Sequence, residues 1–455
     1  MRSKTRITIN SQTPFIRFKL GYFELVEKYG KLSDPMNLDD LHRGVDYELS
    51  PGGVTSMIYP LLNELIKENK IEIPYWISLG PNAPYNVKTG NLNLINISLN
   101  EKDLPLYTNF KEGLWRELHL QGPMDIDPDE YEAFTKYNWY CAKKLFQVLP
   151  QTDLYFIHDF QQIQIGNLIG PSAPTIFRWH IPFKLDNISP LIRNFILKNV
   201  SCFDAVIVST RRDLEDLVRA GYHGKAFQLY PYTDINKWKK PSRGKTDAFI
   251  SRLKIKKSDK VITIVARIDA IKSQDLAIAA LSQIRHKFPS AKLLLLGNGS
   301  FTGSRKGGLA HPKSKQWKDK LLSYAKELKV EKQVIMPGYI KDEDLATAYS
   351  ISDVIVVPSR IEGFNLTTIE AWIHRKPVIV STGAGSSELV VEDINGYVFD
   401  PNNHSELGEK IELLLKHPEA AIKMGEQGYL TALQSDINRA VKTVTAIFDE
   451  MLQAR

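Results

Sequence analysis

The second half of the chain alternates short, continuous apolar runs with segments of helical period. Apolar runs rich in β-branched residues predict buried strands, and apolar residues that recur every three or four positions predict helices. Strands that are apolar on both faces and alternate with helices indicate a parallel sheet covered on both sides. The strands predicted in this half are 261–267, 291–297, 332–338, 353–359 and 376–381, and the clearest helices are 273–288 and 343–352.

The first half shows the same alternation with more irregular insertions. Ligands of open parallel sheets bind beyond the carboxyl ends of the strands. We therefore predict an α/β fold in which two doubly wound, Rossmann-like domains face a cleft. The strands predicted here are 73–79, 153–159, 175–180, 204–209 and 225–231, and the helices are 53–68 and 128–147.

The domain boundary is predicted from a basic stretch, residues 237–247, which Pro and Gly interrupt. We interpret this stretch as the linker. Residues 1–236 are then the N-terminal domain and residues 237–430 the C-terminal domain. Residues 431–455 are predicted to form a C-terminal helix that packs back towards the N-terminal domain.

Composition places the chain among ordinary globular proteins, with 455 residues, 43% hydrophobic and 24% charged. Its two cysteines, Cys141 and Cys202, provide no disulfide framework and fit a reducing compartment. Residues 1–15 carry positive charge without the apolar core of a signal peptide. No run approaches the roughly 18 apolar residues of a membrane span. A cytoplasmic location is therefore expected.

The net charge of +7 favours anionic partners, although a surface with excess lysine explains it equally well. No nucleic-acid-binding module is recognisable, so nucleic acid is not an expected partner. Residues 15–31 mix Lys and Arg with aromatic residues but also carry two glutamates, which fits a membrane-surface helix only in part. Membrane association thus stays an alternative. The basic insert 302–320 is interpreted as a solvated loop, with a lid or docking patch as the second reading.

Candidate chemistry first appears after the strand 261–267, where Arg267 ends the strand and Lys272 follows five residues later. Two cations at the carboxyl edge of a sheet suit a diphosphate, whose charge must be met when it departs. Arg and Lys after a strand are usually solvated, so this pair alone is a weak signal.

A second candidate follows the strand 353–359, in the stretch "EGFNLTTIE". Glu362 precedes the turn and can accept hydrogen bonds from sugar hydroxyls, and Glu370 lies within the next helix, where it could hold the two hydroxyls of a ribose. Alternatively, Glu362 could be a partner of the helix dipole and Glu370 a surface residue. That alternative explains either glutamate alone, but it does not explain the pair together with the upstream cations. The helix start offers backbone N–H groups to a phosphate, namely those of Phe364, Asn365 and Leu366.

The first domain offers a glycine pair and polar strand ends. Gly52 and Gly53 precede an apolar helix, and paired glycines let a sugar or phosphate approach the backbone. His158 and Asp159 end one predicted strand, and His180 ends the next. A histidine at a strand end is more often structural than catalytic. Two neighbouring strands that end in polar groups at the cleft favour a functional reading.

Together, "ARIDAIK" and "EGFNLTTIE" resemble the donor site of retaining GT-B glycosyltransferases, which has two acidic residues eight apart and an earlier Arg and Lys five apart. The resemblance implies a nucleoside diphosphate sugar as donor, bound by the C-terminal domain. It implies that Glu362 contacts the sugar and Glu370 the ribose. It also implies that Arg267 and Lys272 bind the diphosphate.

The first domain resembles the trehalose-phosphate synthase branch of this class, through the glycine pair, "HDF", "HIPF" and the stretch "YTNFKEGLWRELH". The resemblance implies acceptor binding by this domain. Two departures leave the acceptor open: the spacing of Tyr to Trp in that stretch is one residue short, and Lys rather than Pro follows "HIPF". The implied acceptor-binding residues are Tyr107, Trp115, His119 and His158.

The resemblance implies a retaining hexosyltransferase that moves a hexose, with glucose favoured, to a small sugar, sugar phosphate or polyol. The leaving phosphate would take the acceptor proton, His180 would contact the transferred sugar, and Asp159 would orient that sugar or the acceptor. No cofactor or metal is expected, because the two cations supply the charge and the acidic run 125–129 is interpreted as a capped helix start. A membrane-surface enzyme with a lipid or glycan acceptor and a non-catalytic binder are the alternatives. A homo-oligomer is left open.

Overall fold

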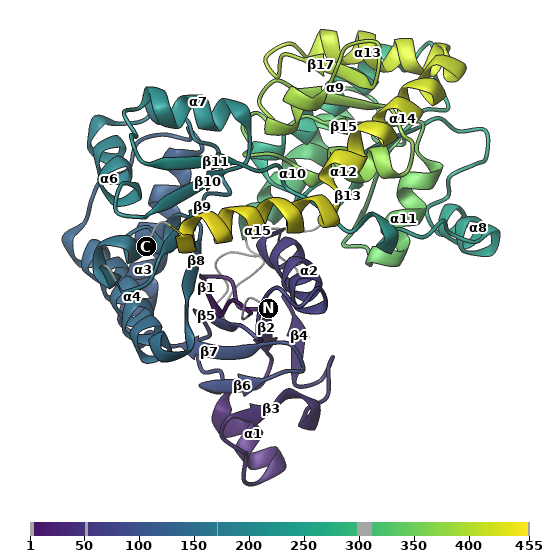
Figure 1. The fold of residues 1–455 in the computed structure, drawn as a ribbon. Coiled ribbons are helices and arrows are strands. Elements are labelled where there is room, and N and C mark those ends of the chain that lie inside the picture. Colours follow the sequence, from purple (N-terminus) through teal and green to yellow (C-terminus); the bar gives the residue numbers. More distant parts are fainter. Residues whose placement is uncertain (1–3, 51–52, 171, 298–311, 454–455) are drawn as a thin grey trace. The chain divides into compact units, whose positions relative to one another are not determined.

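The computed structural model describes residues 4–50, 53–170, 172–297 and 312–453. The chain divides into two compact units, of which unit 1 comprises Met1–Tyr230 and Ile437–Arg455 and unit 2 comprises Pro231–Asp436. Each is an α/β unit built around a mainly parallel sheet (Figure 1). The predicted α/β fold with two doubly wound units is thereby confirmed.

The stretch predicted as a linker, residues 237–247, lies within unit 2. Its last residues begin helix α8 (Arg243–Arg252), because the Ser242 hydroxyl accepts a hydrogen bond from the Lys245 N–H at 3.3 Å and caps the helix. Serine at this position is a strong helix-start signal that outweighs the nearby Pro and Gly. The division between the units falls after Tyr230 instead.

Unit 1 is organised around β1 (Ile7–Ser11), which pairs in parallel with β5 on one side and β8 on the other. The strand order over the described residues is β11-β10-β9-β8-β1-β5-β7-β6-β3. The order therefore reverses between β1 and β8. The other strands of unit 1 are β2 (Ile16–Phe18), β3 (Met36–Asn37), β4 (Tyr47–Leu49), β5 (Tyr75–Leu79), β6 (Asn86–Lys88), β7 (Asn93–Ile97), β8 (Leu154–His158), β9 (Thr175–Arg178), β10 (Ala205–Val208) and β11 (Lys225–Gln228).

The helices of unit 1 include the two that the sequence predicts, α2 and α4. Asp127 caps α4 by accepting from the N–H groups of Asp129 and Glu130, so the acidic run is a helix start, as predicted. The helices are α1 (Tyr22–Tyr29), α2 (Gly53–Lys67), α3 (Asp103–Leu118), α4 (Pro128–Gln147), α5 (Ile165–Ile169), α6 (Pro190–Val200), α7 (Arg211–Arg219) and α15 (Ile437–Gln453).

The last helix, α15, belongs to unit 1 although it follows unit 2 in the sequence (yellow in Figure 1). Its Phe448 ring meets the ring of Phe156 on β8 edge-on, at a centroid distance of 5.5 Å. Glu450 forms an ion pair with Lys225 of β11 at 3.2 Å. The helix thus closes over the sheet of unit 1.

The sheet of unit 2 is entirely parallel over the described residues, with the order β14-β13-β12-β15-β16-β17. All five strands predicted from the sequence are present, and β17 is the one that the pattern did not predict. The strand order of this sheet reverses between β12 and β15. The strands are β12 (Val261–Val265), β13 (Lys292–Leu296), β14 (Val334–Gly338), β15 (Val354–Val357), β16 (Val378–Ser381) and β17 (Gly396–Phe399).

The helices of unit 2 pack closely where glycine permits it. The buried Trp372 of α12 donates its indole N–H to the Asn395 carbonyl at 2.8 Å. A Cβ on Gly428 of α14 would lie 2.0 Å from this indole, so only glycine allows the contact. Besides α8, the helices are α9 (Gln274–Ile284), α10 (Pro312–Glu327), α11 (Asp342–Ile351), α12 (Leu366–Ile373), α13 (His404–Lys416) and α14 (Pro418–Ala432).

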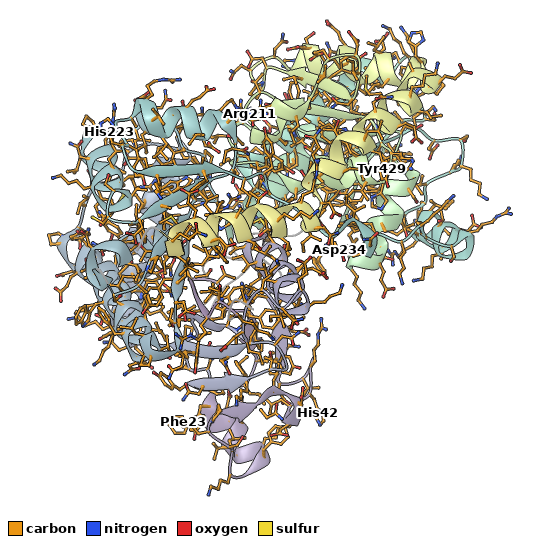
Figure 2. All side chains as sticks on the ribbon, in the orientation of Figure 1. Phe23, His42, Arg211, His223, Asp234 and Tyr429 are labelled. Atoms are coloured by element: carbon orange, nitrogen blue, oxygen red, sulfur yellow. The ribbon has the colours of Figure 1, made fainter. Side chains whose placement is uncertain are left out.

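Among the described residues, no helix combines the length and the apolar character needed to cross a membrane. The segment that fitted a membrane-surface helix in part contains the short helix α1. Phe23 on α1 is 84% exposed, and Figure 2 shows it pointing away from unit 1. The opposite face of α1 buries Leu25.

Candidate functional site

The candidate site of unit 2 lies where the strand order of its sheet reverses. The chain runs from β12 outward to β13 and β14, and then returns to the other side of β12 to form β15. Because β12 and β15 pair in parallel, their carboxyl ends meet at one edge of the sheet. Arg267 follows β12 by two residues, and Glu362 follows β15 by five. Ligand sites of open parallel sheets lie at such reversals.

The Glu362 carboxylate is held by three side chains. Lys272, at the end of a single 3₁₀ turn, forms an ion pair with Oε1. Ser359 Oγ and Asn365 Nδ2 each donate to Oε2 at 2.7 Å. The Lys272 and Glu362 side chains are only 12% and 19% exposed. Burial alone would raise the pKa of Glu362, but Lys272 and the two hydrogen bonds hold it below its ordinary value, so the carboxylate stays ionised at neutral pH.

The start of α12 is fixed against the end of β12. Asn365 has a φ of 88° and caps the helix, because its Oδ1 accepts from the Thr367 N–H at 2.8 Å. The Thr367 hydroxyl donates to the Val265 carbonyl at 3.0 Å, which ties the first turn of α12 to β12. Phe364 and Leu366 lie with Asn365 at this helix start, where backbone N–H groups and the helix dipole favour an anion. Their role in phosphate binding stays a prediction.

Glu370 lies in the second turn of α12 and has partners different from those of Glu362. The hydroxyl of Tyr349, on α11, donates to Glu370 Oε2 at 2.7 Å. His374 Nδ1 lies 2.8 Å from the Glu370 carbonyl oxygen. Unit 2 therefore brings Lys272 and Glu362 into direct contact and places Glu370 on the helix that Glu362 precedes.

Arg267 occupies the loop between β12 and the 3₁₀ turn that carries Lys272. Its carbonyl accepts a hydrogen bond from Gln274 Nε2 at 2.7 Å, which fixes the backbone of this loop to α9. Arg267 and Lys272 therefore both follow the carboxyl end of β12, as the sequence predicts.

The candidate site of unit 1 lies at the corresponding reversal, between β1 and β8. His158 ends β8, and His180 follows β9 by two residues. His158 Nδ1 and His180 Nε2 are 3.1 Å apart, and the two rings stack with centroids 5.4 Å apart. Burial, together with the nearby Arg178 guanidinium, lowers the pKa of both imidazoles well below the ordinary value. Both histidines are therefore neutral at physiological pH.

Only His180 of this pair is partly accessible. His158 is 1% exposed, and its ring packs against that of Phe156 at 4.1 Å. His158 is therefore a buried partner of the His180 ring. The acceptor contact predicted for His158 stays a prediction.

Asp159 follows β8 directly, in a backbone conformation that is unusual for a residue other than glycine. Its φ is 72°. Its carboxylate accepts the Phe160 N–H at 3.0 Å and so caps a short 3₁₀ turn. Burial raises the pKa of Asp159 to about 7, although the N–H groups of Phe160 and His180 oppose the shift. A carboxyl group that titrates near neutrality is typical of functional sites.

The aromatic stretch of α3 divides between core and surface. Tyr107 is fully buried and contacts the Tyr137 ring at a centroid distance of 4.6 Å. Trp115 is partly exposed and stacks on His119 at 4.1 Å, and His119 Nδ1 lies 2.8 Å from the Trp115 carbonyl oxygen. Trp115 and His119 therefore form one aromatic pair, and Tyr107 lies apart from it in the core.

The predicted glycine pair is described only in part. Gly53 is the first residue of α2, is exposed, and has open space where a Cβ would lie. Gly52 lies outside the described residues. The donor-binding role of both glycines stays a prediction.

Sequence reasoning missed the side chains that hold the predicted residues in place. Ser359 is three residues before Glu362 and could have been found as a nearby donor. Asn365 was predicted for its N–H group, whereas its side chain links the helix cap to Glu362. Tyr349 is 21 residues from Glu370 on another helix, and nothing in the sequence pattern signals the pair.

Comparison with known proteins identifies the class to which this fold and these sites belong. Residues 245–431 match the family model of glycosyl transferases group 1, and residues 51–214 match that of the trehalose synthase N-terminal domain. The chain therefore has the GT-B fold and carries glycosyltransferase domains. These domains match the group 1 glycosyl transferases and the trehalose synthase N-terminal domain, so the resemblance predicted from the sequence is confirmed.

Individual relatives are distant. A D-inositol 3-phosphate glycosyltransferase of Segniliparus rotundus is 28% identical over 171 residues, which cover 38% of this chain and 35% of that protein. The chain thus spans only about a third of the length of that relative. The trehalose-6-phosphate synthase OtsA has a TM-score of 0.75 at 16% identity and 99% coverage of both chains. Anabaena Alr3699/HepE, in complex with UDP and glucose, has a TM-score of 0.65 at 14% identity, covering 98% of this chain and 99% of that one.

Proposed function

We propose that the protein transfers a hexose, with glucose favoured, from a nucleoside diphosphate sugar to a small polyhydroxylated or phosphorylated acceptor, with retention of configuration. The observation that carries this proposal is the shielded carboxylate of Glu362, held by Lys272 at the strand-order reversal of unit 2. An ionised acceptor for sugar hydroxyls and a cation for a departing phosphate lie there side by side. The solved structure of a GT-B neighbour that contains UDP and glucose supports the choice of donor.

The donor would be held at the carboxyl edge of the unit 2 sheet. Glu362 would accept hydrogen bonds from the hexose, and Glu370 from the ribose. The diphosphate would lie between Arg267 and Lys272, with the start of α12 as a further source of N–H groups. Charge that develops on the leaving diphosphate is stabilised where cations are already fixed, because no reorganisation is then needed during the reaction.

The residues of unit 1 would act on the transferred sugar and the acceptor. His180 is neutral and can donate to or accept from a sugar hydroxyl, and Asp159 would orient the sugar or the acceptor. The partly exposed Trp115, stacked on His119, offers an aromatic ring of the kind on which sugar C–H groups pack. Retention would not require a protein nucleophile, because an oxygen of the leaving diphosphate takes the acceptor proton.

Metal independence is part of the proposal, because Arg267 and Lys272 supply the positive charge that a metal brings elsewhere. Turnover should be unchanged after extensive dialysis against EDTA. Loss of turnover that magnesium or manganese restores would contradict this, and Asp125 and Asp127 would then be the first carboxylates to test.

The decisive experiment is a screen of UDP-, GDP- and ADP-hexoses against sugars, sugar phosphates and polyols, read by release of the nucleoside diphosphate. We expect release that requires both a donor and an acceptor, with a product that keeps the anomeric configuration of the donor. Glu362→Gln is the matched control, because it keeps the side-chain shape and removes the charge. Nucleotide binding without release under any pairing would support a non-catalytic binder instead.

A lipid acceptor is the second candidate, and the exposed aromatic side chains of α1 favour it. Tyr22 is 45% exposed and Phe23 84% exposed. Apolar side chains of this kind enter the interface of a bilayer when basic residues accompany them. Sedimentation with anionic phospholipid vesicles should detect such binding, and a Phe23→Ser variant should lose it. Protein that stays in the supernatant at low salt would remove this candidate.

A further inference from the structure

We propose that Tyr349 is a positioning residue that orients the Glu370 carboxylate and thereby sets the discrimination between ribose and deoxyribose in the donor nucleotide. This inference rests on the ribose role proposed above for Glu370. The Tyr349 hydroxyl donates to Glu370 Oε2 at 2.7 Å, and the two residues belong to different helices, α11 and α12.

The Tyr349 ring is held in place by its neighbours, so its hydroxyl can orient the Glu370 carboxylate. It is fully buried, stacks on the His374 ring at a centroid distance of 4.9 Å, and meets the Trp238 ring edge-on at 5.9 Å. Trp238 also meets His374 edge-on, at 5.1 Å. His374 is itself anchored by Nδ1 to the Glu370 carbonyl at 2.8 Å. These contacts restrain both the Tyr349 hydroxyl and the backbone of Glu370.

The chemistry of the pair suits orientation of a hydrogen-bond acceptor. Burial and the Glu370 charge raise the pKa of Tyr349 well above its ordinary value, so the hydroxyl remains a donor at every pH at which the enzyme is handled. A carboxylate has about four acceptor positions, and one bond to Oε2 restrains its orientation without exhausting them. The two hydroxyls of a ribose require an acceptor in a defined orientation, because hydrogen bonds weaken steeply as their angle departs from linear.

Glu362 and Glu370 are therefore held by different means. Glu362 contacts a cation, whereas a neutral phenol holds the Glu370 side chain. A neutral donor can orient a carboxylate through a hydrogen bond without placing a positive charge beside it.

The test is the affinity of Tyr349→Phe for a nucleoside diphosphate and for its 2′-deoxy counterpart, measured by calorimetry with the tightest binder among UDP, GDP and ADP. We expect the variant to bind the ribonucleotide about tenfold more weakly, as for loss of one hydrogen bond to a charged group. Binding of the deoxynucleotide should change less than about twofold, so the ratio of the two affinities falls towards one.

Tyr397→Phe is the matched control. The Tyr397 hydroxyl also donates to a carboxylate, that of Asp393, at 2.9 Å, but this pair lies at β17. We expect this variant to keep the wild-type ratio. A general effect of removing a phenol from unit 2 would lower the ratio in both variants and would overturn the proposal.

Glu370→Gln separates this inference from the proposed function. If Glu370→Gln leaves the ratio unchanged, the ribose role of Glu370 is wrong and the inference falls with it. If Glu370→Gln lowers the ratio and Tyr349→Phe does not, only the inference is overturned. In the Glu370→Gln background, Tyr349→Phe should have no further effect on the ratio. A Tyr349→Phe protein without a native near-ultraviolet dichroism spectrum would also overturn it, because the hydroxyl would then be needed for folding.

Discussion

Replacing Lys272 by Met should both destabilise unit 2 and abolish turnover, and a second substitution should separate the two effects. Lys272→Met keeps an unbranched side chain and removes the ammonium group that pairs with Glu362. The Glu362 carboxylate then remains 81% shielded from solvent, since its side chain is 19% exposed, with hydrogen bonds from Ser359 and Asn365 alone. An ionised carboxylate in that position is costly.

The magnitude follows from the geometry of the pair. Removing one partner of a fully buried ion pair costs about 3–5 kcal/mol. Two hydrogen bonds to Glu362 survive and some solvent reaches the site, so we expect about 2–3 kcal/mol here. Adding Glu362→Gln should restore more than half of this loss, because the amide removes the stranded charge and can still accept a hydrogen bond. Turnover should stay about two orders of magnitude or more below wild type in both variants.

Urea unfolding followed by tryptophan fluorescence, together with release of nucleoside diphosphate, measures both quantities. Protonation provides an internal check of the cause. In wild type the pKa of Glu362 is held low, so its contribution to stability is present above the unfolded pKa and is lost as the pH falls through the folded pKa. In Lys272→Met, burial without the cation should raise this pKa, so the deficit relative to wild type should shrink as the pH falls from 7.5 to 5. Wild-type stability of Lys272→Met at pH 7.5, or turnover regained in the double variant, would refute the reasoning.

Three further predictions concern unit 1. Asp46 is buried and binds Lys28 and Tyr29, which hold its pKa at about 2 against the effect of burial. Asp46→Asn should lower the free energy of unfolding, measured in urea at pH 7, by about 2 kcal/mol, and this difference should vanish as the pH falls from about 4 to 2. Asp159 has its pKa raised to about 7, so kcat/KM should show an inflection near pH 7 that Asp159→Asn lacks, and the variant should be more stable than wild type at pH 8, where ionised Asp159 destabilises the fold. Trp115→Ala should raise the KM for the acceptor and leave the affinity for the donor intact. If the affinity for the donor falls by the same factor, α3 has a structural role and does not bind the acceptor.

The sequence pattern predicted the buried strands well because both faces of these strands are covered. Among the strands of unit 2 that it predicted, β15 is a continuous apolar run, and β12 has one threonine among four apolar residues. It missed β1 of unit 1, whose sequence ITINS alternates apolar and polar residues although all five positions are buried. Two of the polar residues find partners there: Thr8 hydrogen-bonds with Thr152 at 2.7 Å, and Asn10 donates to the Ile77 carbonyl at 3.0 Å. Such partners are distant in sequence, so local pattern cannot reveal them.

In the candidate site, too, the local sequence predicted the residues themselves but not the partners that come from distant parts of the chain. The local stretch from Glu362 to Glu370 predicted two carboxylates, a glycine turn and a helix start, and the structure contains the helix start. That stretch could not predict that the two glutamates differ in their surroundings. The difference comes from Lys272 and Tyr349, which reach them from two other elements.

The contacts of Glu362 and Glu370 explain why the two glutamates are separated by the start of a helix. Asn365 turns the chain with a φ of 88°, caps α12 through its oxygen and donates to Glu362 through its nitrogen. Glu362 is thus fixed to the start of the helix, and Glu370 is fixed to its second turn by Tyr349. The helix is in turn tied to the end of β12 through Thr367. One short rigid helix therefore sets the distance between the group proposed to hold the hexose and the group proposed to hold the ribose, and a ligand that spans both must match that distance.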